Sequence, residues 1–181
     1  MPKAAYGIWP AAGDGEMLIL YDPEDPEREL TRFEFPRQPD RDRLCLADYF
    51  RRADGGQRDV VALQIVTVGD ELLDRSSAMM EAGDYSEGYY LHGFGVRLAE
   101  AGAEYVHERI REDLGISPDR GLRYSWGYGA CPDVLQHARV FDLLPAREAL
   151  GMNLTDAGAL VPELSTAALV VHHPQAKYFS A

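Results

Sequence analysis

Short apolar runs separated by turn residues fill the first third of the chain. The runs cover residues 4–10, 17–21 and 30–35. Glycine, proline and aspartate between them, at 13–15 and 22–26, are typical of tight turns between strands. We therefore predict an antiparallel meander of three strands, followed by a polar loop over 36–43 and a short buried helical turn within 44–50.

Residues 59–68, with the sequence DVVALQIVTV, are the strongest strand candidate. The segment is mostly apolar and rich in β-branched residues, as expected of a central strand that is buried on both faces. Beyond it, apolar residues recur at steps of three and four, which is typical of helices. We predict helices over 70–83 and 84–114, with Asp70 as the cap of the first and Asp84, in a capping box with Glu87, as the cap of the second.

The second half of the chain mixes the two patterns. Residues 123–133 are expected to form a loop, and two short helices are predicted within 132–141 and 145–150. The tail, 157–180, is expected to add two strands, one of them including 166–171. Strands followed by helices and then by strands indicate an α+β fold, and the length of 181 residues suits a single domain.

Charge and apolar content exclude several classes of protein. The net charge is −12 and no basic run stands out against it, so we expect no nucleic-acid partner. The longest mainly apolar stretch, 60–68, is too short to span a membrane, and the N-terminal residues lack the apolar core of a signal peptide. Two cysteines, Cys45 and Cys131, indicate no disulfide framework, and we expect a cytoplasmic protein.

Residues that commonly carry catalysis or bind metals form no established pattern. Cys131, His137 and the pair His172-His173 leave metal binding open as an alternative, but their spacing matches no zinc motif. Cys131 precedes Pro132 at a predicted helix start, where a thiol can be activated, yet no base is paired with it. A small buried cysteine is the better interpretation, and we predict neither a catalytic residue nor a metal site.

The stretch RYSWGYGACPD, residues 123–133, is the densest in unusual side chains. Arg123 offers a planar fork that suits a carboxylate. Gly127 and Gly129 let the backbone approach a ligand closely, and the three aromatic residues offer flat faces for a purine or a cation. Together these features suit a small zwitterion that carries an aromatic base, although a tight aromatic-packed turn explains them about equally well.

The same stretch resembles the Arg-x-x-x-Gly-Tyr-Pro-Ala-Cys-Pro signature of the activation domain of cobalamin-dependent methionine synthase. Other segments resemble that domain in the same order, and together they cover nearly the whole chain: YGIWPA, LCLADYF, RLAEAGAEYVHERIR, GMNLTDAGALVP and HPQAKYF. The resemblance implies an α+β domain over residues 1–181, built on a bent antiparallel β-sheet with flanking helices.

The resemblance also implies a function in methionine biosynthesis. Domains of this family bind S-adenosylmethionine and dock on a cobalamin-binding domain. Flavodoxin or another reductase supplies an electron, S-adenosylmethionine supplies a methyl group, and methylcobalamin is restored. This methyl transfer requires positioning rather than an acid, a base or a covalent residue. The alternative is a docking module of the same fold that binds the cobalamin domain without the ligand.

Seven site residues follow from the resemblance: Glu100, Arg123, Tyr128, Gly129, Ala130, Cys131 and Tyr178. Arg123 matches the arginine that holds the carboxylate of the ligand. Ala130 and its neighbours match backbone that meets the adenosyl part, and Tyr178 matches a tyrosine near the sulfonium. Glu100 matches an acid on the long helix that is linked with the ligand and with the cobalamin-facing surface.

The chain departs from the family pattern in three respects. Gly129 replaces the proline of the signature and is expected to loosen the loop. The family's aspartate for the amino group of the ligand lies upstream of YGIWPA, and we expect this segment to be lacking. We expect the family's C-terminal helical tail to be lacking as well, so that binding of S-adenosylmethionine would be weakened.

Overall fold

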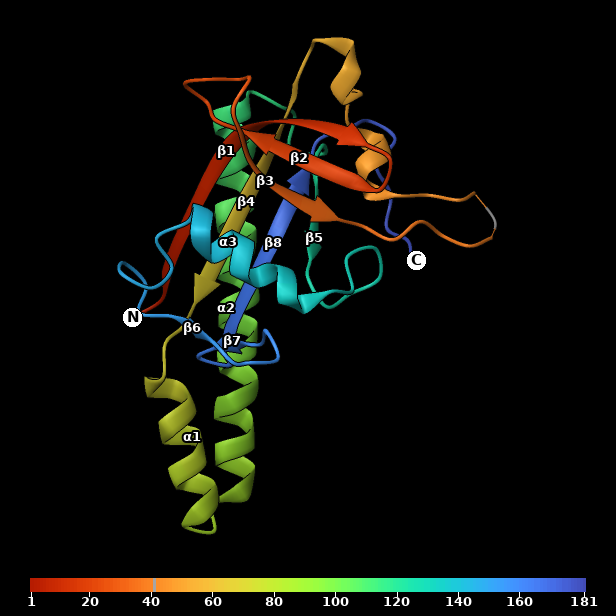
Figure 1. The fold of residues 1–181 in the computed structure, drawn as a ribbon. Helices are drawn as coiled ribbons and strands as arrows, with labels where there is room; N and C mark the ends of the chain where they lie inside the picture. Colours follow the sequence, from red (N-terminus) through yellow and green to blue (C-terminus); the bar gives the residue numbers. More distant parts are fainter. Residues whose placement is uncertain (41) are drawn as a thin grey trace.

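A six-stranded antiparallel sheet with the strand order β3-β2-β1-β4-β8-β5 forms the centre of the molecule (Figure 1). A computed structural model describes residues 1–40 and 42–181. The strands of the sheet are β1 (Lys3–Asp14), β2 (Met17–Tyr21), β3 (Glu29–Glu34), β4 (Asp59–Thr67), β5 (Leu122–Ser125) and β8 (Ser165–Val171). Two further short strands, β6 (Asn153–Leu154) and β7 (Leu160–Val161), pair with each other.

The central position of β4 confirms the strand prediction for 59–68. β4 pairs with β1 on one side and with β8 on the other, and all its residues from Val61 to Thr67 are buried. Leu63 and Ile65 belong to the main core on one face, whereas Ala62 and Val66 belong to the cluster under α2 on the other. Because both faces are covered, the strand is apolar almost throughout.

Helices cover the two faces of the sheet. α2 (Tyr85–Leu114) runs behind the sheet in Figure 1, and α3 (His137–Leu143) crosses its front. α1 (Glu71–Glu81) packs against the first half of α2, and the two form a hairpin that projects beyond the sheet. Three short 3-10 turns complete the fold: η1 (Leu46–Tyr49), η2 (Ala53–Gly55) and η3 (Val134–Gln136).

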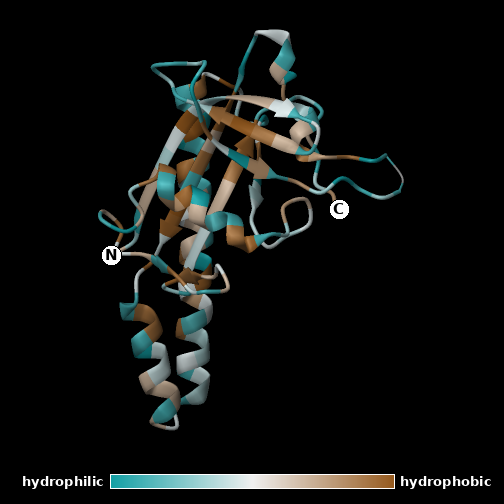
Figure 2. Ribbon diagram, in the orientation of Figure 1, coloured by the Kyte–Doolittle hydropathy of each residue, from teal (hydrophilic) through white to brown (hydrophobic). Residues whose placement is uncertain are grey.

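Apolar side chains gather in the sheet rather than in the projecting hairpin. Figure 2 shows most of the strongly hydrophobic segments in the strands and in the elements packed on them. On the α2 side, Val170 of β8 packs in one cluster with Ala103, Val106 and Ile110 of the helix. Burying a side chain of this size contributes about 1.5–3 kcal/mol, so this seam fixes the second half of α2 on the sheet.

The structure corrects three expectations about local structure. Residues 122–125 form the edge strand β5 instead of the start of a loop, because they pair with β8 in a register that no local pattern reveals. Residues 146–150 form turns and not the predicted helix: the amides of Ala149 and Gly151 do donate to the carbonyls of Pro145 and Arg147, but these two bonds do not extend into a continuous helical series. Asp70 and Asp84 do stand at the N-termini of α1 and α2, but neither side chain caps its helix.

No helix among residues 1–40 and 42–181 combines the length and the apolar character needed to cross a bilayer.

Candidate functional site

A cavity of about 660 Å³ lies beside β5, the edge strand of the sheet. Five parts of the chain line it: α2, β5 with the loop that follows, His137 of α3, the segment 160–167, and Tyr178 with Phe179 near the C-terminus. The antiparallel pairing of β5 with β8 brings the second and fourth of these parts together. The cavity is therefore a product of the sheet topology and not of one segment.

Arg123 carries a positive charge into this cavity. Along β5 the side chains of Tyr124 and Trp126 enter the main core, so the intervening residues face α2. There Nη2 of Arg123 donates a hydrogen bond of 2.9 Å to Oε2 of Glu100. Nη1 of Arg123 is buried and has no hydrogen-bond partner among the described residues. Such an unsatisfied donor costs about 1–3 kcal/mol, which an acceptor on a ligand would relieve.

The two members of this ion pair differ in exposure. The side chain of Arg123 is 16% exposed and that of Glu100 is 53% exposed. Only one oxygen of Glu100 is engaged by Arg123. The cavity thus presents one fixed positive and one more accessible negative charge side by side, an arrangement that is complementary to a zwitterion such as an amino acid.

Buried histidines near the cavity stay neutral. His107 on α2 has both ring nitrogens buried and without hydrogen-bond partners among the described residues. Burial lowers the pKa of His107, and the nearby guanidinium of Arg111 lowers it further. Burial likewise lowers the pKa of His137, whose Nδ1 lies 2.8 Å from the carbonyl oxygen of Gly158. A neutral His107 adds no second cation beside Arg123.

The aromatic residues of the 123–133 stretch divide between core and surface. Trp126 is buried, with its ring 5.4 Å from Phe33 and 5.8 Å from His137. The hydroxyl of Tyr124 donates to the carbonyl of Lys177 at 2.8 Å, and burial raises the pKa of this phenol. Tyr128 is 74% exposed and lies at the mouth of the cavity. Two of the three aromatics therefore also serve as core residues.

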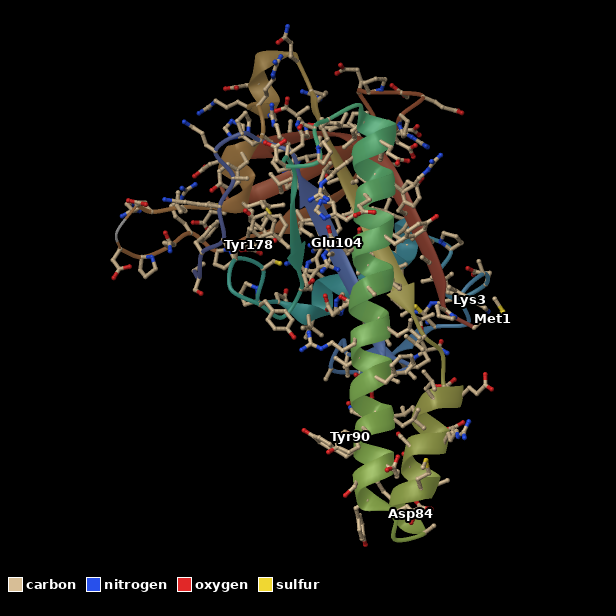
Figure 3. All side chains as sticks on the ribbon, turned by 180° about the vertical axis from the view of Figure 1, so that it is seen from behind. Met1, Lys3, Asp84, Tyr90, Glu104 and Tyr178 are labelled. Atoms are coloured by element: carbon tan, nitrogen blue, oxygen red, sulfur yellow. The ribbon has the colours of Figure 1, made fainter. Side chains whose placement is uncertain are left out.

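The last residues of the chain, 176–181, cross the 127–131 loop and are called here the C-terminal strap. The amide of Ala181 donates to the carbonyl of Gly129 at 3.4 Å, and Nε2 of Gln38 donates to the carbonyl of Ser180 at 2.6 Å. In Figure 3, Tyr178 lies beside the loop that follows β5. Through Tyr178 and Phe179 the strap forms one wall of the cavity.

Gly129 is the point at which the strap approaches the loop most closely. Its φ of +38° lies in the left-handed region, and a Cβ atom there would stand 2.6 Å from the carbonyl oxygen of Phe179. Proline, with φ fixed near −65°, could not adopt this backbone. Glycine at this position does more than loosen the loop, because it makes the close contact with the strap possible.

The structure brings together six of the seven site residues that the sequence suggests. Those that line the cavity are Glu100, Arg123, Tyr128, Gly129, Ala130 and Tyr178. Cys131 is fully buried behind it, and its thiol donates to the carbonyl of Ser125 at 2.9 Å. Burial raises the pKa of Cys131 to about 12, so this cysteine is not an activated nucleophile.

Sequence reasoning missed the other walls of the cavity. His137, Phe179 and the segment 163–167 line it, although none carries a local signal for binding. Only the pairing of strands and the path of the strap reveal them. Within the part of the chain that the structure describes, no group of three or more histidine, cysteine, aspartate or glutamate residues is arranged to hold a metal ion.

An antiparallel sheet whose edge strand places an arginine at a cavity that the C-terminal strap partly walls defines the class: an α+β domain with a cavity of small-molecule size. The chain belongs to the family of the vitamin B12-dependent methionine synthase activation domain, whose model matches residues 1–181. It is similar to the methionine synthases of Mycobacterium tuberculosis (38% identical, 97% of this chain, 17% of the relative) and Mycobacterium leprae (36% identical, 97% and 16%). It therefore spans about a sixth of the length of these relatives.

A solved structure has the same fold. The crystal structure of the MetH reactivation domain bound to AdoHcy matches with a TM-score of 0.89 and 28% sequence identity, covering 99% of this chain and 61% of the other. This similarity confirms the α+β class and the antiparallel sheet with flanking helices.

Proposed function

We propose that the chain binds S-adenosylmethionine in the cavity beside β5 and supports the reductive methylation of cobalamin held by a partner domain. The observation that carries the proposal is the buried Nη1 of Arg123, which lacks an acceptor although its guanidinium is paired with Glu100. The AdoHcy bound by the similar MetH reactivation domain supports it, because AdoHcy is S-adenosylmethionine without its methyl group.

The charges of the cavity fit the amino-acid end of this ligand. Arg123 would hold the α-carboxylate through a charge-assisted hydrogen bond, which is stronger than a hydrogen bond between two neutral groups. Glu100, with one oxygen engaged by Arg123, would hold the α-ammonium group. A cavity of about 660 Å³ also has room for the adenosyl part, along the loop backbone at 128–130 and the strap.

The side chains around the cavity position the ligand and do not react with it. When bound, the sulfonium supplies an activated methyl group, so no acid or base from this chain is needed. The thiol of Cys131 stays protonated, and His137 stays neutral because burial lowers its pKa. The role of the domain is then to hold the methyl donor at the mouth of the cavity, beside Tyr128, for a docked partner.

The partners and the cellular setting follow from this function. We assign as partners the cobalamin-binding domain of methionine synthase and flavodoxin or another reductase as the electron donor. Both cysteines, Cys45 and Cys131, are free and buried, which is in keeping with the reducing cytoplasm. We further propose that residues 1–181 form one domain, because a single sheet unites strands from both ends of the sequence.

Calorimetry with S-adenosylmethionine and AdoHcy tests the proposal. The wild-type chain should bind both at one site, and Arg123→Ala should weaken binding by about 30-fold or more, the value of a charge-assisted hydrogen bond. Arg75→Ala is the matched control, because Arg75 is an exposed arginine on α1, a helix that does not line the cavity. Equal affinity in wild type and Arg123→Ala would contradict the assignment.

The ion pair itself favours one alternative function. Since Glu100 already neutralises Arg123, the cavity can exist without a ligand, and the exposed Tyr128 can contact a protein surface instead. The chain would then be a docking module for a cobalamin domain. A pulldown with that domain, run beside the calorimetry, separates the two: docking without saturable uptake of either ligand would favour the alternative.

A further inference from the structure

A second cavity, of about 380 Å³, lies at the opposite end of β5 and β8. Its walls come from η1 and the residues after it, from the start of β4, from Arg120 just before β5, and from 172–174 just after β8. The pair His172-His173, which matches no zinc motif, lies here, together with Tyr49 and Arg51. The S-adenosylmethionine proposal uses none of these residues.

Both acidic residues of this cavity are already neutralised. Arg37 forms a bidentate ion pair with Asp48, in which Nη1 and Nη2 donate to the two carboxylate oxygens at 2.5 and 2.8 Å. Asp59 accepts a hydrogen bond of 2.6 Å from the backbone amide of Arg51 and lies 3.3 Å from Nε of the same residue. Their negative charges are therefore balanced before any ligand is considered.

Arg120 is the surplus cation of the cavity. Its Nη2 donates to the carbonyl oxygen of His172 at 3.1 Å, and among the described residues it forms no ion pair with a carboxylate. Its Nε is buried and has no hydrogen-bond partner there either. A hydrogen bond from Ser117 and, more weakly, the charge of Arg120 lower the pKa of the adjacent Asp119, so this carboxylate feels the guanidinium without pairing with it. An arginine with no ion pair in a cavity is unusual in a chain with a net charge of −12.

Two neighbouring groups add further donors. Nδ1 of His173 accepts a hydrogen bond of 3.2 Å from the backbone amide of Gln175, which leaves Nε2 as the donor of this ring. The ring of Tyr49 lies 5.5 Å from that of His173, and the buried hydroxyl of Tyr49 has no hydrogen-bond partner among the described residues. The guanidinium of Arg120, the imidazole N–H of His173 and the hydroxyl of Tyr49 are the types of donor that bind oxyanions.

We propose that this second cavity binds the phosphate group of a small phosphorylated molecule, with Arg120 as the charged donor. A phosphate dianion supplies the several acceptor oxygens that these donors lack, whereas a metal cation would be repelled by the guanidinium. The volume of about 380 Å³ exceeds the need of a phosphate alone, and the neighbouring rings of Tyr49 and His173 offer an aromatic wall for an organic part.

Calorimetric titration of the whole chain with inorganic phosphate and, separately, with phenyl phosphate tests the proposal. Both probes should bind at one site, and phenyl phosphate should bind more tightly because its ring meets the aromatic wall. Arg120→Gln should weaken both by about tenfold or more, while Arg97→Gln, which removes the same charge from an exposed position on α2, should leave them unchanged.

A second variant keeps the proposal testable even if Arg120→Gln does not fold. Tyr49→Phe keeps the ring but removes the unpaired hydroxyl, and it should weaken both probes by about threefold to tenfold with an unchanged melting temperature. Binding of AdoHcy should be the same in wild type and both variants, so this result is independent of the first cavity. Absence of saturable phosphate binding to the wild type, or equal binding to wild type and both variants, would overturn the proposal.

Discussion

The two cavities at opposite ends of β5 and β8 each contain an arginine, and the two arginines differ in their partners. Arg123 shares its charge with Glu100 at 2.9 Å, whereas the side chain of Arg120 donates to a backbone carbonyl and, among the residues that the structure describes, to no carboxylate. A balanced pair favours a ligand that carries both charges, and an unbalanced arginine favours a plain anion. If both proposals hold, the presence or absence of an acid beside each arginine, and not the arginine alone, sets the class of ligand.

The cavities also differ in how they are closed. The first depends on the C-terminal strap, whose Phe179 carbonyl would be 2.6 Å from a Cβ atom at residue 129. The second is walled by η1 and by the ends of β4, β5 and β8, which the sheet holds in place. The first cavity should therefore be the more easily disrupted of the two.

The largest effect is expected from Gly129→Ala. The added methyl would collide with the strap backbone, so the strap should detach and binding of AdoHcy should fall by about 100-fold or more, while phosphate binding is retained. Gly115→Ala is the matched control, because Gly115 also has a positive φ, +64°, but a Cβ atom added there would meet no other atom within 4 Å. Equal AdoHcy affinity in the two variants, measured by calorimetry, would refute the role of the strap contact.

The next largest effect on ligand affinity is expected from replacing either arginine, Arg123 or Arg120, by glutamine. Arg123→Gln should lower AdoHcy affinity by about 30-fold and leave phenyl phosphate unaffected, and Arg120→Gln should do the reverse. Titration of each variant with each ligand measures this directly. If either variant weakened both ligands equally, the two cavities would not be separate sites.

Glu100→Gln should make the first cavity resemble the second. Without its carboxylate partner, Arg123 becomes an unbalanced cation, so AdoHcy should lose about fivefold to tenfold in affinity as its ammonium loses an ion pair. Acetate or another simple carboxylate should bind more tightly than to the wild type. If AdoHcy and acetate both bound Glu100→Gln more weakly than the wild type, Glu100 would serve only to orient the guanidinium of Arg123.

The smallest effect is expected from pH. The folded-state pKa of His107 and of His137 is lowered chiefly by burial, so the unfolded state binds more protons below its own pKa of about 6.5. Stability should be full above that pH and decline below it toward the folded-state pKa, by at most about 1.4 kcal/mol per pH unit for each histidine. Urea unfolding from pH 7.5 to 5 measures the slope, which His107→Gln should reduce.

The chain's local patterns established much of the fold. The apolar run at 59–68 indicated a strand buried on both faces, and steps of three and four indicated the two helices that became α1 and α2. These predictions succeeded because periodicity depends on near neighbours in the sequence. The prediction of a helix at 145–150 was wrong, because the segment makes only two separate helical-type hydrogen bonds and closes as turns.

The sequence by itself determined the class of fold and pointed to the dense stretch at 123–133, with Arg123 as the residue that we propose binds a carboxylate. Only the tertiary structure paired that arginine with Glu100, closed the cavity with the strap over Gly129, and left Arg120 without an ion pair within the described part of the chain. The physical reason is that side-chain type and spacing are local, whereas burial and charge balance arise between segments that the sheet brings together from distant parts of the chain.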